Sequence, residues 1–301
     1  RAHTRVARAV PTGMEILSPR FPRRTGTMKV TVLGSGSVGN STLVEAADDR
    51  VLVDAGFSGR EIELRMHAIG VDPASLSGIV ITHDHTDHTR GMGILARRFG
   101  TPLYLTHRTA RACAPLLDGS ERIVEYETTK PVRIGALEVQ PFLTVHDAVD
   151  PVAVTVRHVP TGSKMGVATD LGRPTATVRA ALAGCHLLVL EANHDDALLW
   201  RGPYPWSVKQ RIASSHGHLS NRAAAELLRE LFHPDLVAVA LAHLSQHCND
   251  AGLARAHVGR ALARCGYTGW FQVAGQDAPL ETVDVMAMRK RYGHGEQLTL
   301  L

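Results

Sequence analysis

In this chain a short apolar run is followed at once by a dense group of side chains of the types that bind metal ions. Residues 78–91 read GIVITHDHTDHTRG, and the first five have the composition of a buried strand. His83, His85, Asp87 and His88 follow directly. If the backbone stays extended, His83 and His85 point the same way, and the turn after them brings Asp87 and His88 round to the other side. One segment therefore presents two groups of ligands to a common space.

Four ligands are too few for two metal ions, so others must come from elsewhere in the chain. A catalytic zinc takes three protein ligands, and paired metals ~3.5–4 Å apart can share a hydroxide. Ligand-type residues end four further β-rich runs: Asp54 in VLVDAG, His146 after LEVQPFLTV, Asp170 after KMGVAT and His243 after DLVAVALA. Each alone would be interpreted as a turn, capping or surface residue. Given the group at 83–88, we expect His146, Asp170 and His243 to be ligands.

The periodicity predicts one domain in which sheets pack in layers with helices outside. In ETTKPVRIGALEVQPF, Pro and Gly interrupt a run of alternating apolar residues, which predicts a hairpin. We expect strands near 28–33, 41–46, 50–54, 78–82, 102–105, 122–126, 132–134, 137–145, 153–158, 164–169, 186–191 and 236–241. Helices are expected at 59–69, 90–99, 107–116, 174–183, 220–232 and 250–265, and a loose polar tail at 286–301.

Charge is divided unevenly between the start of the chain and its body. Residues 1–27 hold six arginines and one acid, whereas residues 28–301 hold 27 Lys and Arg against 28 Asp and Glu, a net charge of −1. The overall basicity therefore does not indicate a nucleic-acid groove in the body. We interpret 1–27 as a disordered basic extension, with a transit peptide as the alternative.

Composition also bears on the compartment. No apolar run approaches the ~20 residues that span a bilayer, so no membrane partner is expected. The four cysteines form no C-x-x-C pair, which favours a reducing, cytoplasmic setting over a disulfide framework.

The glycine-rich stretch GSGSVG at 34–39 matches a dinucleotide-binding fingerprint but lacks its context. Such a fingerprint should open a helix, whereas NSTLVEA follows it and is typical of a second strand. We interpret it as a strand connection that could border an active site.

The ordered motifs VDAG, THDHTDH, TVHD, ATDLG and LAHLS resemble those of the metallo-β-lactamase-fold hydrolases over about residues 28–285. The resemblance implies a four-layered αββα sandwich (α/β class). It also implies two divalent metal ions, zinc first and manganese as an alternative. By position, His83, His85 and His146 would bind one ion. Asp87, His88 and His243 would bind the other, Asp170 would bridge them, and Asp54 would orient a ligand from behind.

Finer motifs narrow the activity. VLEANHD, SSHGHLSN and LAHLSQHCN are similar to segments of the RNase Z-like phosphodiesterase branch, where Glu191 and His218 would form a proton-handling pair. A strand-end salt bridge and an ordinary helix residue are their alternatives. Only 23 residues separate His146 from Asp170 and 72 separate Asp170 from His243, so neither a transfer-RNA arm nor a β-CASP insertion fits. The compact pattern most resembles the YycJ/WalJ-type group, which implies DNA exonuclease activity in the 5′ to 3′ direction.

The mechanism expected from this resemblance is phosphodiester hydrolysis by a metal-bridged hydroxide. Asp87 would orient or deprotonate the hydroxide, and His218, held by Glu191, would protonate the leaving oxygen. Two alternatives remain open: a small-molecule hydrolase acting on a cyclic nucleotide, thioester or lactone, and a zinc-stabilised binding module.

One aromatic and basic segment could contact substrate. WRGPYPWSVKQRI, at 200–212, interleaves Trp and Tyr with Arg and Lys, so that Tyr204, Lys209 and Arg211 are candidates to meet bases and phosphates. A packed loop with a solvated basic edge is the equal alternative.

Overall fold

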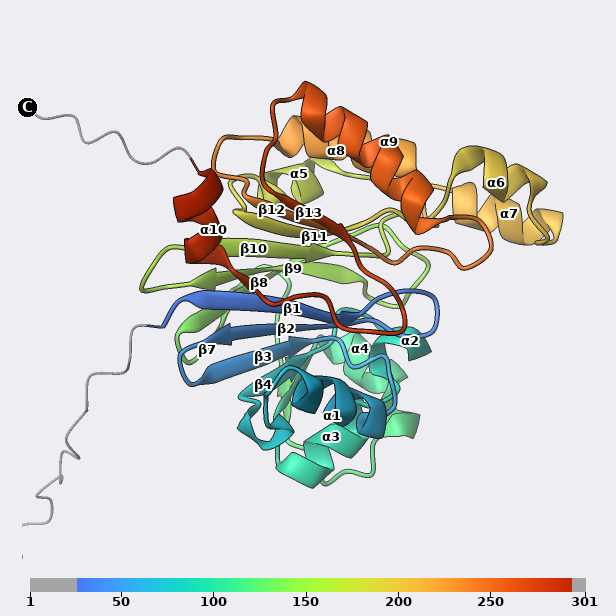
Figure 1. The fold of residues 1–301 in the computed structure, drawn as a ribbon. Helices are drawn as coiled ribbons and strands as arrows, with labels where there is room; N and C mark the ends of the chain where they lie inside the picture. The colour runs from blue at the N-terminus through green and yellow to red at the C-terminus, as the bar shows by residue number, and fades with distance from the viewer. Residues whose placement is uncertain (1–25, 294–301) are drawn as a thin grey trace, which may run out of the picture.

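Two seven-stranded sheets pack face to face, with helices on both outer sides (Figure 1). The computed structural model describes residues 26–293. Its four layers confirm the expected αββα sandwich. Within the described range, no helix combines the length and the apolar character needed to cross a membrane. Nearly all of the predicted extension at 1–27, and the stretch 294–301 of the predicted tail, lie outside the described residues.

The first sheet has the strand order β14-β1-β2-β3-β4-β5-β6. Its β1 to β3 are antiparallel neighbours, whereas β3 to β6 run parallel. The strands are β1 (Met28–Gly34), β2 (Ser41–Ala46), β3 (Asp49–Val53), β4 (Gly78–Val80), β5 (Leu103–Leu105), β6 (Ile123–Glu125) and β14 (Val283–Asp284). The helices of this half are α1 (Gly59–Ala68), α2 (Thr86–Thr89), α3 (Met92–Phe99) and α4 (His107–Ala112), with 3₁₀ turns at Pro73–Ser75 and Ala114–Leu116.

The second sheet has the order β13-β12-β11-β10-β9-β8-β7 and changes from antiparallel to parallel at β10. Its strands are β7 (Val132–Ile134), β8 (Leu137–Leu143), β9 (Val152–His158), β10 (Lys164–Ala168), β11 (Leu187–Glu191), β12 (Ala238–Ala242) and β13 (Trp270–Val273). The helices of this half are α5 (Ala176–Leu182), α6 (Asp196–Arg201), α7 (Trp206–Ala213), α8 (Asn221–Leu231) and α9 (Ala251–Arg264). The last helix, α10 (Val285–Tyr292), follows β14 and contacts β1 and β14 of the first sheet.

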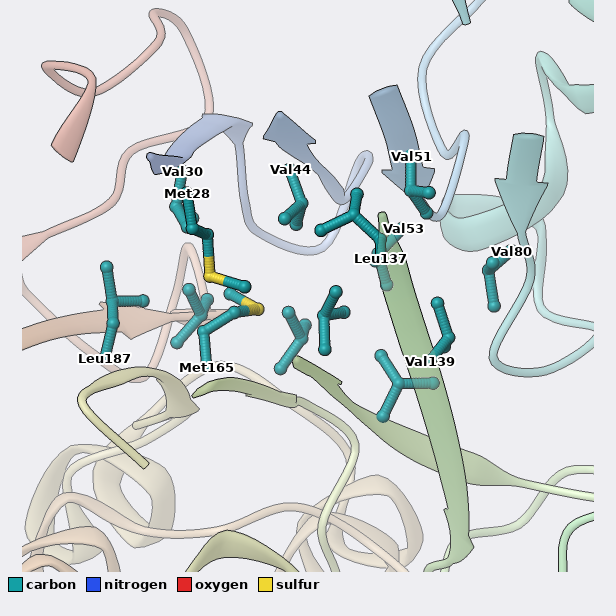
Figure 2. Close-up of a cluster of buried hydrophobic side chains, with 14 of the residues drawn as sticks. Met28, Val30, Val44, Val51, Val53, Val80, Leu137, Val139, Met165 and Leu187 are labelled. Atoms are coloured by element: carbon teal, nitrogen blue, oxygen red, sulfur yellow. The ribbon is translucent and has the colours of Figure 1, made fainter. Parts of the chain in front are cut away.

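The central strands are apolar on both faces because each face packs against another layer. Successive side chains along a strand point to opposite faces. In β11, Leu187 and Val189 enter the core between the sheets, whereas Leu188 and Leu190 enter the core beneath α5, α8 and α9. In β3, Val51 and Val53 face the other sheet and Leu52 faces α1 and α3. Figure 2 shows the inter-sheet core, where Met28, Val44 and Leu137 converge with the residues of β10 and β11.

Most expected elements form near their predicted bounds, including the β7–β8 hairpin. The predicted loose tail is wrong for residues 286–292, which belong to α10. Asp284 caps that helix through the backbone N–H of Ala287, and Val285 is fully buried against the inter-sheet core. The elements α2, α6, α7, β13 and β14 were not expected, because none of them shows a clear hydrophobic period in the sequence.

Two leucines on β8 should differ sharply in their contribution to stability. Leu137 is fully buried between the sheets, whereas Leu143, on the same strand, is 51% exposed. We expect Leu137→Ala to lower the free energy of unfolding by roughly 2–5 kcal/mol, because it leaves a cavity in a packed core. Leu143→Ala is the matched control and should change it by less than about 0.5 kcal/mol. Urea unfolding followed by circular dichroism measures both, and equal losses would contradict this packing.

Candidate metal centre

The candidate site lies where strands of both sheets end. Asp54 follows β3, Asp170 follows β10 and His243 follows β12. All three have left-handed backbone, with φ of 62°, 58° and 54°. This conformation costs about 1–2 kcal/mol at a non-glycine residue, and it persists only where the surroundings hold it. At each strand end the chain turns sharply, and the three buried side chains meet in one region.

The segment after β4 divides into two parts, as its spacing predicts. His83 follows the strand and His85 is the residue before the first turn of α2, whereas Asp87 and His88 lie inside that turn. The one-turn helix is what carries Asp87 and His88 away from the first pair.

His83, His85 and His146 form the first cluster. One ligand atom from each lies within 4.8 Å of the others. The Nδ1–H of His146 donates to the carbonyl oxygen of Gly217 at 3.0 Å. Its Nε2 is therefore the atom that carries a lone pair, and it lies 3.3 Å from Nδ1 of His85. A histidine that donates one ring N–H to a fixed acceptor is typical of metal ligands.

Asp87, His88 and His243 form the second cluster under the same distance limit. His88 Nδ1 lies 2.8 Å from Oδ2 of Asp54, whose carboxylate also accepts the backbone N–H of Thr82 at 2.9 Å. Asp54 thus stands behind His88 and leaves its Nε2 directed into the site. The neighbouring Asp87 lies with Oδ2 3.4 Å from His243 Nε2.

Asp170 lies between the two clusters. Its Oδ2 is 3.1 Å from Nε2 of His88, and its Oδ1 is 3.5 Å from Nε2 of His146. Although burial opposes ionisation, His243 and His88 hold the pKa of Asp170 well below its usual value. The carboxylate therefore presents one negatively charged oxygen to each cluster.

Glu191 closes the floor of the site and is fully buried. Its Oε2 accepts the backbone N–H groups of Leu171 and Leu219 at 2.8 and 2.9 Å. Its Oε1 lies 2.8 Å from Nδ1 of both His218 and His243. Burial alone would raise the pKa of Glu191, but its two imidazole partners lower that pKa to about 2. One ionised carboxylate therefore orients two histidines whose Nε2 atoms remain available.

The donor set fits divalent metal binding. Buried polar atoms normally have partners, yet Nε2 of His83 is buried and has none. Burial lowers the pKa of His83 well below its ordinary value, so the ring is a neutral ligand with a lone pair. Imidazole nitrogens and carboxylate oxygens are the ligands of zinc, manganese and iron sites. The seven predicted ligands converge here; their division between two ions stays a prediction.

The glycine-rich β1–β2 loop borders this centre, as its composition allowed. The amide of Asn40 lies 3.3 Å from Oδ2 of Asp87 and 3.2 Å from Nε2 of His88. Ser35 donates to Asn40 at 2.7 Å and accepts the backbone N–H of His243 at 2.8 Å. Sequence reasoning assigned no role to Ser35 or Asn40. The sequence did hold a signal for them: Ser35 and Asn40 are polar residues at the two ends of the β1–β2 loop. The strand that starts after this loop pairs with β3, which ends just before Asp54.

A cavity of about 220 Å³ opens above the metal centre. His85, Asp87, His146, Asp170, His218 and His243 form one side of it. Helix α7 and the preceding turn form the other side through Tyr204, Val208, Arg211 and Ile212. The helices α6 and α7 project from the sandwich beside the site (Figure 1).

The predicted substrate residues of this lobe have different surroundings. Tyr204 and Arg211 both line the cavity, and Arg211 also pairs with Asp147. Lys209 is not among the lining residues, and its ammonium donates to the backbone carbonyl of Trp200 at 2.9 Å. The role of all three in substrate binding stays a prediction.

Comparison with known proteins agrees with the motif resemblance. A family model described as a beta-lactamase superfamily domain matches residues 49–239. The exodeoxyribonuclease YycJ of Bacillus anthracis is 33% identical over 239 residues, covering 79% of this chain and 90% of that relative. The exodeoxyribonuclease WalJ of Streptococcus pneumoniae is 34% identical over 241 residues, covering 78% and 88%.

The fold is also found in solved structures. The metallo-β-lactamase fold protein YhfI from Bacillus subtilis aligns with a TM-score of 0.66 at 19% identity, covering 85% of this chain and 99% of that one. This likeness supports the fold alone.

Gly56 should be essential to the packing around the centre. A Cβ at this position would lie 1.6 Å from the backbone oxygen of Asp87 and 2.6 Å from the backbone nitrogen of Asn40. We expect Gly56→Ala to lower the free energy of unfolding by roughly 2 kcal/mol or more, because backbone must move to accept it. Displacement of Asp87 should also reduce bound metal.

The control is Gly275→Ala, where an added Cβ meets nothing within 4 Å. Urea unfolding and elemental analysis of both variants make the test. A Gly56→Ala protein with the stability and metal content of the control would show that the loops do not approach so closely.

Proposed function

Because this chain belongs to the beta-lactamase superfamily, we propose that it is a dinuclear metal-dependent phosphodiesterase that degrades DNA from its ends. The observation that carries the proposal is the meeting of two ligand clusters around Asp170, with the His218–Glu191 pair beside them. The names of the two exodeoxyribonuclease relatives support DNA as the substrate class.

In this proposal His83, His85 and His146 hold one ion and Asp87, His88 and His243 hold the other. Asp170 bridges the pair, and Asp54 orients His88. Zinc is the proposed metal, with manganese as the alternative, because the ligands are imidazoles and carboxylates. Bound metal ions would supply Lewis acidity toward the phosphate and acidify water at neutral pH.

The chain's own groups account for the proton movements. His218 lines the cavity and holds its Nδ1–H against Glu191 at 2.8 Å, so its Nε2 faces the space where substrate would lie. From there the imidazole can give a proton to the departing oxygen. Asp87, also on the cavity wall, is held ionised: burial opposes this, but His88 and His243 lower its pKa well below the usual value. It can orient the attacking water.

The lobe of α6 and α7 is the proposed contact for the strand. Trp200 and Trp206 are 43% and 64% exposed, and their ring centroids lie 5.2 Å apart. Tyr204 and Arg211 reach the cavity itself. Exposed aromatic rings beside a phosphate site suit bases that stack without sequence preference. Lys209 contributes by holding the lobe through Trp200, and we propose the 5′ to 3′ direction from the YycJ/WalJ resemblance alone.

The substrate class is tested by comparing three compounds with one metal-loaded preparation. We expect release of nucleotides from end-labelled DNA and hydrolysis of bis-p-nitrophenyl phosphate, because the site is built for phosphodiesters. Hydrolysis of a thioester should be at background. Labels at the 5′ or the 3′ end report the direction. Rapid thioester turnover with intact DNA would instead place the protein among small-molecule hydrolases.

His218→Ala separates proton transfer from metal binding. We expect turnover of DNA to fall by a factor of about 10²–10⁴, because the leaving oxygen loses its acid. Metal content should stay near two ions per chain. His216→Ala is the matched control: that exposed side chain lies two residues away and does not line the cavity, so activity should be retained. Loss of metal from His218→Ala would make His218 a ligand and refute its proposed role.

A further inference from the structure

A groove rich in arginine lies between α8 and α9, apart from the metal centre. Its volume is about 300 Å³. None of its residues belongs to the site described above. We call it the arginine groove, and it is lined by Arg222, Ala225, Glu226, Arg229, His257, Arg260, Ala261 and Arg264.

The positive charge of this groove is a local concentration. Residues 28–301 hold 27 basic and 28 acidic side chains, so the body as a whole is nearly neutral. Helices α8 and α9 together carry five arginines against two glutamates. Helix α9, with the sequence AGLARAHVGRALAR, contains no acid at all. The arginines therefore exceed what nearby carboxylates can neutralise.

The ion pairs in and around the groove confirm the excess. Arg222 forms an ion pair with Glu226 at 3.2 Å. Glu230, the other glutamate of α8, forms its ion pair with Arg179, which lies outside the groove. Within residues 26–293, no ion pair holds Arg229, Arg260 or Arg264, and all three are exposed. Clustered guanidinium groups without counter-charges repel one another, and each offers a planar fork that suits phosphate. The groove is thus suited to a ligand with several phosphates.

The topology connects this groove to the catalytic edge. Helix α9 follows β12, and α8 begins after the lobe of α6 and α7 that follows β11, where the backbone N–H of Leu219 donates to Glu191. The strands β11 and β12 are parallel neighbours. Both helices therefore begin at the edge that carries Glu191 and His243 and lie side by side on the outer face of the second sheet (Figure 1). Arg222, in the first turn of α8, also reaches Asp196 of α6 at 3.4 Å. At Arg222 the groove therefore adjoins the lobe of α6 and α7.

We propose that the arginine groove binds the sugar–phosphate backbone of a nucleic acid whose end occupies the catalytic cavity. The choice of nucleic acid among polyanions rests on the proposed function. The contacts are to phosphates, so binding is independent of sequence. Affinity should then increase with substrate length until the strand spans the groove, and it should fall as salt rises because bound counterions are released.

The test reverses charge in the groove and, as a control, elsewhere. Arg260→Glu/Arg264→Glu changes two groove positions that lack ion pairs. Lys290→Glu/Arg291→Glu makes the same change in net charge at two exposed positions on α10, at the end of the molecule opposite α6 and α7 (Figure 1). Anisotropy of fluorescent phosphorothioate DNA of about 30 and about 4 nucleotides measures binding by the metal-loaded protein without cleavage, over a range of salt concentrations.

We expect the groove variant to bind the long DNA at least tenfold more weakly than wild type near 0.1 M salt. The slope of log affinity against log salt should decrease by about 1–2, because two phosphate contacts are lost. Binding of the short DNA and hydrolysis of bis-p-nitrophenyl phosphate should not change. A groove variant that binds long DNA as tightly as the α10 variant would overturn the proposal.

The two proposals fail in different ways. Hydrolysis of bis-p-nitrophenyl phosphate by wild type, with long-DNA binding insensitive to the groove variant, would refute the groove and leave the phosphodiesterase intact. Salt-sensitive DNA binding through the groove, without hydrolysis of any phosphodiester, would support the groove and refute the proposed function.

Discussion

The hydrogen bonds that the buried carboxylate of Glu191 accepts hold the candidate site together. A buried ionised carboxylate is very costly unless hydrogen-bond donors surround it. Glu191 receives two backbone N–H groups and two imidazoles, which come from the end of β10, the start of α8 and the end of β12. It therefore joins the segments that follow β10 and β12 to the segment that precedes α8, and it sets the orientation of His218 and His243 together.

Buried carboxylates and the histidines that contact them are concentrated at this edge of the sandwich. Asp54, Asp170 and Glu191 are at most 3% exposed, and each contacts a histidine. Asp54, Asp170 and His243, which follow strands, also adopt the left-handed backbone conformation. Such strain and buried charge are tolerated because the three apolar cores stabilise the sandwich independently of its edge. The same arrangement leaves an unpartnered nitrogen on His83, which metal coordination would satisfy.

Long elements could be predicted from the sequence because burial leaves a clear period. The apolar runs of β11 and β12, and the amphipathic α8, lie within two residues of their expected bounds. The lobe of α6 and α7 could not be predicted, since α7 has no buried residue and so carries no core-facing pattern. The helix α10 was not predicted, because its sequence contains several basic residues and only one buried apolar residue, Val285.

The local order of residues was enough to indicate which His and Asp side chains would converge at this edge, because residue types that can bind metal follow apolar strands directly in the sequence. It also determined the layered architecture, through strands that are apolar on both faces. Three features became visible only in the folded chain: Asn40 contacts Asp87, Glu191 contacts two histidines, and α8 and α9 form an arginine groove. Each of these depends on segments far apart in the chain, whose approach is set by sheet topology and close packing rather than by local residue order.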